Sequence, residues 1–110
     1  MNLYPDNVKR LVESVLHGSG HTLPQLRQAV EATAARDGGA DRGEADLPAD
    51  LLPYVQKISR HAYKVTDRDI EGLKAAGHTE DVIYEITVSA ALGAALARLE
   101  RGLSVLKESD

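Results

Sequence analysis

The first apolar pattern in the chain is a stripe with helical spacing close to the N-terminus. It comprises Val8, Leu11, Val12, Val15 and Leu16. Residues spaced at i, i+3, i+4, i+7 and i+8 lie on one face of an amphipathic helix. Pro5 stands near the start, where a missing N–H removes no helical hydrogen bond, and a Gly18-Ser19-Gly20 turn follows. The pattern predicts a helix that ends at this turn.

A second helix is predicted between this turn and a polar loop. Thr22 and Gln25 have the spacing of a capping box, so we expect the helix to open at Thr22 and to continue through Arg36. The stretch 37–50 then shows no apolar period, and its first ten residues are Gly, Asp, Ala, Arg and Glu. A segment that buries so little does not recover the entropy lost on ordering, so we expect a mobile loop over 37–50.

The second half of the chain predicts three more helices. The first runs from about Leu51 to Tyr63, with Leu51, Val55, Ile58 and Ala62 on its inward side. The next is bounded by a start signal at Thr66 and Asp69 and by Gly77 at its C-terminal end. The last begins at Thr79 and continues to about Lys107, which is roughly 42 Å at the standard helical rise.

This last helix is apolar on nearly every side between Ile86 and Leu99. A helix that is apolar all round has to be surrounded, and a chain of 110 residues offers few helices for that purpose. We therefore expect a closed homo-oligomer, a dimer, trimer or hexamer, with the helix around Val88–Leu99 at the interface. The residues that carry this expectation are Val88, Ala91, Leu92, Ala95, Leu96 and Leu99.

Composition supports a single all-α domain over 1–110 of about five helices. The chain has no Phe, no Trp and no Cys, so its core is built from Leu, Val, Ile and Ala, which favours helix packing over a sheet. A net charge of −4 argues against nucleic acid as a partner. Met1–Arg10 does not resemble a signal peptide, and the stretch Ile86 to Leu99 is short and interrupted for a membrane span. We expect a cytoplasmic protein without a membrane partner.

The second half also resembles a known family. The run Val65–Ile83, with Thr66-Asp67 at its start and Ala75-Ala76-Gly77 near its middle, precedes the Ala-rich helix Tyr84–Leu99. This order is similar to a segment of the AhpD-like (alkylhydroperoxidase D) and carboxymuconolactone decarboxylase superfamily, and the similarity spans about 51–107. The resemblance implies an all-α fold that assembles as trimers or hexamers, and it makes a relative from the same superfamily a candidate hetero-partner.

The family's peroxidase chemistry does not carry over. According to the resemblance, peroxidase members use a Cys-x-x-Cys pair followed by His. This chain has no cysteine, and the helices over 1–36 match that segment by no motif. Without a thiolate no sulfenate intermediate forms, so we expect no thiol peroxidase.

Three residues are candidates for other chemistry. His61 lies late in the third predicted helix, and Glu85 meets it if the third and fifth helices pack together as the resemblance implies. Such a pair suits general acid–base work, whereas the simpler interpretation is that His61 caps carbonyls and Glu85 pairs with Lys or Arg. Arg98 is a lone cation in an apolar stretch, where it holds a carboxylate ligand or bridges subunits.

No cofactor or metal site is expected. His17 and His21 have a metal-ligand spacing, but Gly18 and Gly20 break the helix between them. The leading hypothesis is a non-redox AhpD-like helical protein that acts through assembly with itself or with a relative. The alternatives are a cofactor-free acid–base enzyme of the carboxymuconolactone decarboxylase kind, using His61, Glu85 and Arg98, and a small-ligand binding protein.

Overall fold

The computed structural model describes residues 4–108, and its regular structure is entirely helical. The elements are α1 (Asp6–His17), α2 (Pro24–Asp37), α3 (Leu52–His61), a 3₁₀ turn η1 (Ala62–Lys64), α4 (Asp67–Ala75) and α5 (Glu80–Glu108). The expected all-α fold with a long C-terminal helix is confirmed. The ends of the predicted 1–110 domain, residues 1–3 and 109–110, lie outside the described residues.

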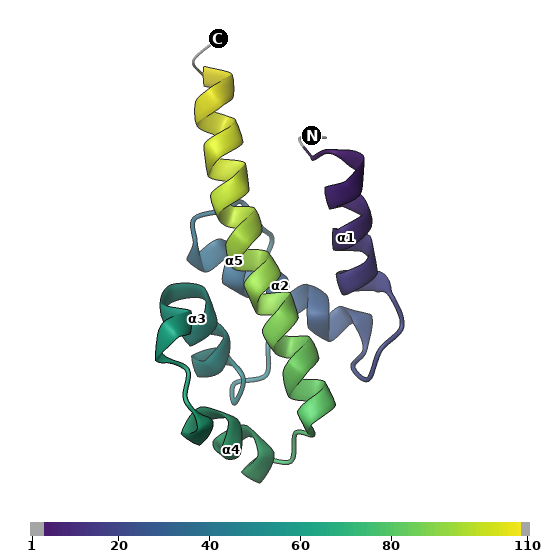
Figure 1. Ribbon diagram of the computed structural model, residues 1–110, viewed down its shortest axis with the longest axis vertical. Coiled ribbons are helices and arrows are strands. Elements are labelled where there is room, and N and C mark those ends of the chain that lie inside the picture. The colour runs from purple at the N-terminus through teal and green to yellow at the C-terminus, as the bar shows by residue number, and fades with distance from the viewer. Residues whose placement is uncertain (1–3, 109–110) are drawn as a thin grey trace.

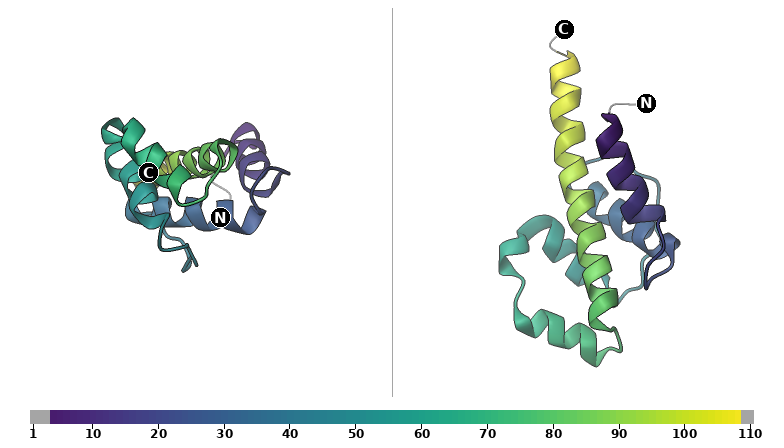
Figure 2. Two further views of the ribbon diagram at one scale, coloured as in Figure 1. Left: turned by 90° about the horizontal axis from the view of Figure 1, so that it is seen from below. Right: turned by 45° about the vertical axis from the view of Figure 1, so that its right-hand side comes forward.

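Helix α5 is the axis of the molecule. It runs the length of the view in Figure 1, with α2 crossing behind it, α1 and α3 on its two sides and α4 at its N-terminal end. The views in Figure 2 show the same arrangement, and the C-terminal end of α5 projects beyond the other helices. The molecule is therefore elongated, with extents of 51 × 28 × 23 Å. No described helix lies across the side of α5 opposite α2 (Figure 1).

Helix α2 approaches α5 closely where the two cross at Gly93. A Cβ atom on Gly93 would lie 2.3 Å from the carbonyl oxygen of Glu31 and 3.0 Å from the Cβ of Ala34. Glycine is needed here because the backbone of α2 occupies the space that any side chain would take. Small residues at the crossing bring the two helix axes close together.

The core lies between α2, α3 and the first half of α5. Its members are aliphatic or small, apart from one tyrosine: Val30, Ala34, Leu51, Tyr54, Val55, Ile58, Leu73, Ile83, Ile86 and Ala90. The predicted inward residues of α3 are confirmed as buried except Ala62, which is exposed because α3 ends at His61. Tyr54 was not predicted to be inward; its hydroxyl is hydrogen-bonded to that of Thr87 at 2.6 Å, which offsets the cost of burying it.

The predicted start of α4 is correct, and the predicted start of α2 is wrong. The capping box of α4 is confirmed, since the backbone N–H of Thr66 donates to the Asp69 carboxylate at 2.8 Å. Gly77 follows α4 with φ 103°, as expected for its C-terminal glycine. The capping box at Thr22 is wrong: α2 begins at Pro24, and the Thr22 hydroxyl donates instead to Glu85 at 2.7 Å.

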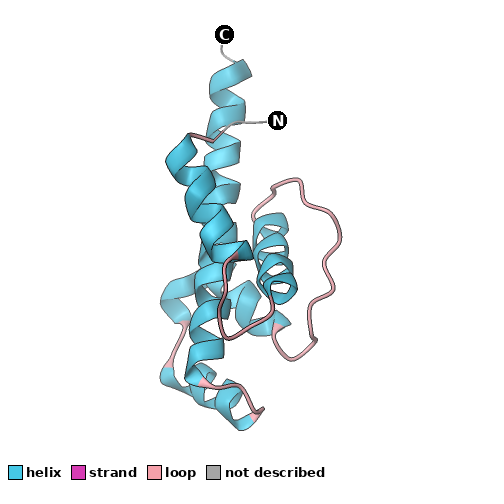
Figure 3. Cartoon of the chain, turned by 90° about the vertical axis from the view of Figure 1, so that its right-hand side faces the viewer, coloured by secondary structure: helices cyan, strands magenta, loops and turns pink. Residues whose placement is uncertain are grey.

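The segment after α2 has no regular structure, as expected, and forms the long loop seen in Figure 3. It is nevertheless tethered. Arg42 pairs with Glu31 of α2 at 3.1 Å and with Glu100 of α5 at 2.6 Å, and Leu47 packs against the core. These contacts hold the loop at Arg42 and Leu47, and residues 43 and 44 between them are exposed.

Helix α5 meets the length and composition of a membrane span. It contains an 18-residue window of mean hydropathy 1.5, which is longer than the stretch from Ile86 to Leu99 considered above, and the absence of a membrane span stays a prediction. Of that window, 44% is buried inside the chain. The central helix of a helical bundle has the same composition, and α5 occupies that central place.

Candidate functional site

The three predicted site residues do not converge. Glu85 and Arg98 are both on α5, but thirteen residues separate them, which is about 20 Å along the axis and roughly 140° around it. His61 lies at the C-terminal end of α3, with an exposed side chain. The structure therefore offers two separate places for polar chemistry, one around Glu85 and one around Arg98.

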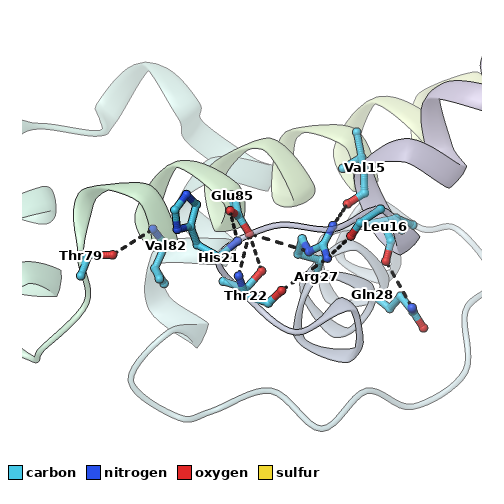
Figure 4. Close-up of polar contacts among 10 residues, drawn as sticks. Val15, Leu16, His21, Thr22, Arg27, Gln28, Thr79, Val82 and Glu85 are labelled. Carbon is cyan, nitrogen blue, oxygen red and sulfur yellow. Dashed lines mark hydrogen bonds and ion pairs between the residues drawn. The ribbon is translucent and has the colours of Figure 1, made fainter.

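The first place is a joint between α5 and the turn that links α1 to α2 (Figure 4). The Glu85 carboxylate accepts hydrogen bonds from the backbone N–H groups of His21 at 2.6 Å and Thr22 at 2.9 Å. It also accepts one from the Thr22 hydroxyl at 2.7 Å. These N–H groups lie in the turn before α2, so Glu85 fastens this turn to α5.

These contacts decide the protonation state of Glu85. Burial alone would raise the pKa of its carboxyl group. The hydrogen bonds from the Thr22 hydroxyl and from the backbone of His21 and Thr22 outweigh burial, so the pKa is lowered from its usual value. Glu85 is thus held as a carboxylate with its oxygens already engaged, which suits an anchor better than a proton-transfer group.

Arg27 completes this joint and was missed by sequence reasoning. Its guanidinium is buried, and Nη1 donates to the Val15 carbonyl at 2.7 Å while Nη2 donates to the Gly18 carbonyl. Arg27 of α2 therefore donates to carbonyl groups at the C-terminal end of α1. The signal was present in the sequence, because Arg27 and Glu31 share the helical spacing of Val30 and Ala34 and so occupy inward positions of α2.

Two buried polar atoms at this joint lack a hydrogen-bond partner among the described residues. They are Nε of Arg27, which lies 3.8 Å from Glu85, and Oγ of Ser89. A groove of about 200 Å³ between α1 and α5 lies beside them, lined by residues that include Val15, Tyr84 and Val88. Both atoms are shielded from its surface, so the groove presents mainly Ser hydroxyls, Tyr84 and Val88.

A second joint ties the loop to the far end of α5. Arg42 lies between Glu31 and Glu100, and the hydroxyl of Tyr4 donates to Glu100. The hydrogen bond from Arg42 lowers the pKa of Glu100 more than burial raises it. The three charged side chains are largely shielded and mutually satisfied, so this cluster fixes the loop and leaves no group available for chemistry.

The second place is a cleft between the C-terminal end of α3 and the middle of α5. Its volume is about 380 Å³, and it is lined by Ile58, Ser59, Arg60, Ala62, Tyr63, Ala91, Ala94 and Arg98. His61 stands beside it, with its ring edge-on to the ring of Tyr63 at 5.9 Å between centroids. His61 and Arg98 thus belong to the same end of the molecule, whereas Glu85 does not.

The two arginines that line this cleft differ in whether a described carboxylate pairs with them. Arg60 is bidentate on Asp37, with both oxygens 2.8 Å from Nε, and this hydrogen bonding lowers the pKa of Asp37. Arg98 has no such partner in the described part of the chain: its Nη1 donates only to the carbonyl of Ala94, one turn earlier, at 3.3 Å. The cleft therefore carries one cation whose charge is not offset.

The histidines do not form a metal site. Within residues 4–108 no three His, Asp or Glu side chains are grouped closely enough to hold an ion. His17 is bonded to Gln28 at 3.1 Å through Nδ1, and Nε2 of His21 lies 3.8 Å from Asp81. His17 and His21 therefore contact different partners.

Comparison with known proteins identifies no relative. No family model matches the chain, no curated protein is similar to it, and no solved structure matches its fold.

Proposed function

We propose that this chain is a non-redox helical assembly protein that associates through one exposed side of α5. The observation that carries the proposal is an uninterrupted apolar surface, here called the outward face. Its residues recur every three or four positions: Tyr84, Val88, Ala91, Leu92, Ala95, Leu99, Gly102 and Leu106. No acidic side chain stands among them, and Arg98 lies at the edge.

Exposure supports the proposal. Tyr84 is 70% exposed, Leu99 36% and Leu106 65%, and the small residues between them are exposed as well. The opposite side of α5 is buried against α2. The apolar residues of the outward face are removed from water only if another surface covers them. An apolar surface of this kind is among the largest that a typical soluble monomer exposes, and such patches often mark interaction sites.

The size of the outward face indicates what must cover it. From Tyr84 to Leu106 it is about 33 Å long and roughly 10 Å wide, or about 330 Å² in projection. A stable interface buries about 800 Å² on each partner, so α5 alone is too small. Helix α1 lies beside α5 and contributes Leu11, which is 54% exposed. An interface formed by α5 and α1 together is larger than one formed by α5 alone.

The simplest occupant is a second copy of the chain. An apolar face with small residues at its centre, Ala91 and Ala95, allows a like face to approach closely. The resemblance to the AhpD-like superfamily supports the same proposal, because its members assemble as closed oligomers. A relative that retains the cysteines is the hetero-partner the resemblance implies. The acid–base alternative draws no support from the geometry, because His61 and Glu85 lie in separate places.

The test is a matched pair of charge variants measured by sedimentation equilibrium. We expect the wild type to give a mass of at least two chains of 11.8 kDa each. Ala95→Lys, at the centre of the outward face, should reduce it to 11.8 kDa with unchanged helical circular dichroism. Ser104→Lys, exposed on the other side of the same helix, should leave the oligomer intact. Equal behaviour of the two variants would contradict the proposal.

A further inference from the structure

We propose that the cleft between α3 and α5 binds a small amphiphilic carboxylate, with Arg98 pairing with the carboxylate group. This site adjoins the outward face, with which it shares Ala91, and it is formed within one chain. The proposal rests on three properties of the cleft: an uncompensated cation, an apolar floor and an aromatic wall.

The cation is Arg98. The protein as a whole is acidic, with a net charge of −4, yet this end of the molecule carries Arg60, Lys64 and Arg98 around the cleft. The nearby carboxylate of Asp37 is already engaged by Arg60 and by the hydroxyl of Ser59 at 2.6 Å. An anion entering the cleft therefore meets the Arg98 guanidinium, which is paired with no carboxylate of the described chain. Guanidinium pairs well with a carboxylate because its donors match the two oxygens.

The floor of the cleft is apolar. Ile58 and Ala94 are buried beneath it and Ala91 is exposed at its margin. These residues offer no hydrogen-bonding side chain, so the part of a ligand that lies on them has to be hydrocarbon. An inorganic anion would satisfy Arg98 but would leave this floor in contact with water.

Tyr63 forms an aromatic wall that is already in position. Its side chain is 80% exposed, yet its ring contacts two neighbours, the edge-on ring of His61 and the Lys64 ammonium 5.9 Å from its centroid. These contacts place the ring beside the cleft in the unliganded chain. The role of His61 in this arrangement is to position Tyr63.

The volume limits the ligand. About 380 Å³ lies near the lower end of the roughly 300–1,000 Å³ typical of small-molecule sites. If each non-hydrogen atom occupies about 30 Å³, the cleft accommodates about a dozen of them. A medium-chain fatty acid or an aromatic acid of one ring and a short chain has this size. Because the cleft is shallow and Arg98 is exposed, we expect a Kd on the order of 1 mM for such a probe.

The experiment is a titration of the ¹⁵N-labelled full chain with octanoate, followed by amide chemical shifts. We expect saturable shifts confined to the residues around Ile58, Tyr63, Ala94 and Arg98. Octan-1-ol, which has the same chain without the charge, should bind at least about fivefold more weakly. Arg98→Gln should weaken octanoate about tenfold, since the loss is that of a charged hydrogen bond. Arg10→Gln, which removes an exposed cation of α1, is the matched control and should bind like the wild type.

The outcomes separate this proposal from self-association. The Ala95→Lys variant should still bind octanoate if the cleft is complete in one chain, whether or not the outward face is an interface. Equal binding of octanoate and octan-1-ol, or shifts centred on Tyr84 and Val88, would show non-specific binding to the outward face and overturn the proposal. So would an Arg98→Gln variant that changes the oligomeric mass but not octanoate binding, because Arg98 would then pair with a carboxylate of another copy.

Discussion

Replacing Gly93 by alanine tests the packing at the centre of the fold. In an exposed helix interior this substitution stabilises by up to about 1 kcal/mol, because alanine has the higher helix propensity. At Gly93 the new Cβ would lie 2.3 Å from the Glu31 carbonyl oxygen and 3.1 Å from the Ala35 nitrogen, both of which are backbone atoms. Backbone atoms cannot rotate away as a side chain can, so the α2–α5 crossing has to widen.

The magnitude follows from these opposing effects. Overpacking a core typically costs about 1–3 kcal/mol, and we take the upper end because the obstructing atoms belong to the backbone. After subtraction of the propensity gain, Gly93→Ala should destabilise the fold by about 2 kcal/mol. For a domain of this size that lowers the Tm by about 8 °C.

Gly72→Ala is the matched control, because Gly72 is also inside a helix but has no atom within 4 Å of the position that a Cβ would take. We expect this variant to be more stable than the wild type by about 0.5–1 kcal/mol. Both variants are measured by urea denaturation with circular dichroism at 222 nm, at one protein concentration because association shifts apparent stability. A Gly93→Ala variant as stable as Gly72→Ala would refute the close crossing of α2 and α5.

Four further predictions follow from individual contacts. Glu85→Gln should lower the free energy of unfolding by about 1–3 kcal/mol at pH 7. Because the folded pKa of Glu85 lies below the unfolded value of about 4.5, this difference from wild type should vanish as pH falls through the folded pKa. Urea denaturation at a series of pH values measures it. Arg42→Gln should increase the rate at which a non-specific protease cleaves the loop near residues 43 and 44, and an unchanged rate would show that the tether does not hold the loop. His61→Ala should leave the Tm within about 2 °C of wild type, since its ring is exposed; loss of folding would contradict this placement. Hydroperoxide reduction with a dithiol donor should be absent from the metal-free protein, and turnover there would disprove the requirement for a thiol.

Local patterns in the sequence were enough to predict the helices. Apolar periodicity and the signals at Thr66, Asp69 and Gly77 act within a few residues, so they predict α4 correctly. The start of α2 was predicted wrongly because Pro24 takes the first helical position and makes Leu23 the N-cap. Thr22 lies one residue before that cap, and its hydroxyl donates to Glu85, which is remote in sequence.

The candidate site was less predictable because it depends on how helices are arranged. Placing Glu85 and Arg98 in one site was already inconsistent with a continuous helix, since thirteen residues of helix separate them by about 20 Å. Arg27 occupies an inward position of α2, but no local pattern shows that its acceptors are the carbonyls at the end of α1. The neighbourhood of Arg98 depends on the contact between α3 and α5, for which no local pattern exists.

The central claim is that the outward face of α5 is covered by another chain in solution, and thiol protection tests it most directly. Because the chain has no cysteine, a single introduced thiol is an unambiguous reporter. Ala95→Cys lies on the outward face and Ser104→Cys on the other side of the same helix, both exposed in the single chain. Alkylation by a maleimide is measured over a range of protein concentrations. The account predicts that Ala95→Cys reacts more slowly as concentration rises, while Ser104→Cys reacts at a constant rate. Equal, concentration-independent rates at the two positions would contradict it.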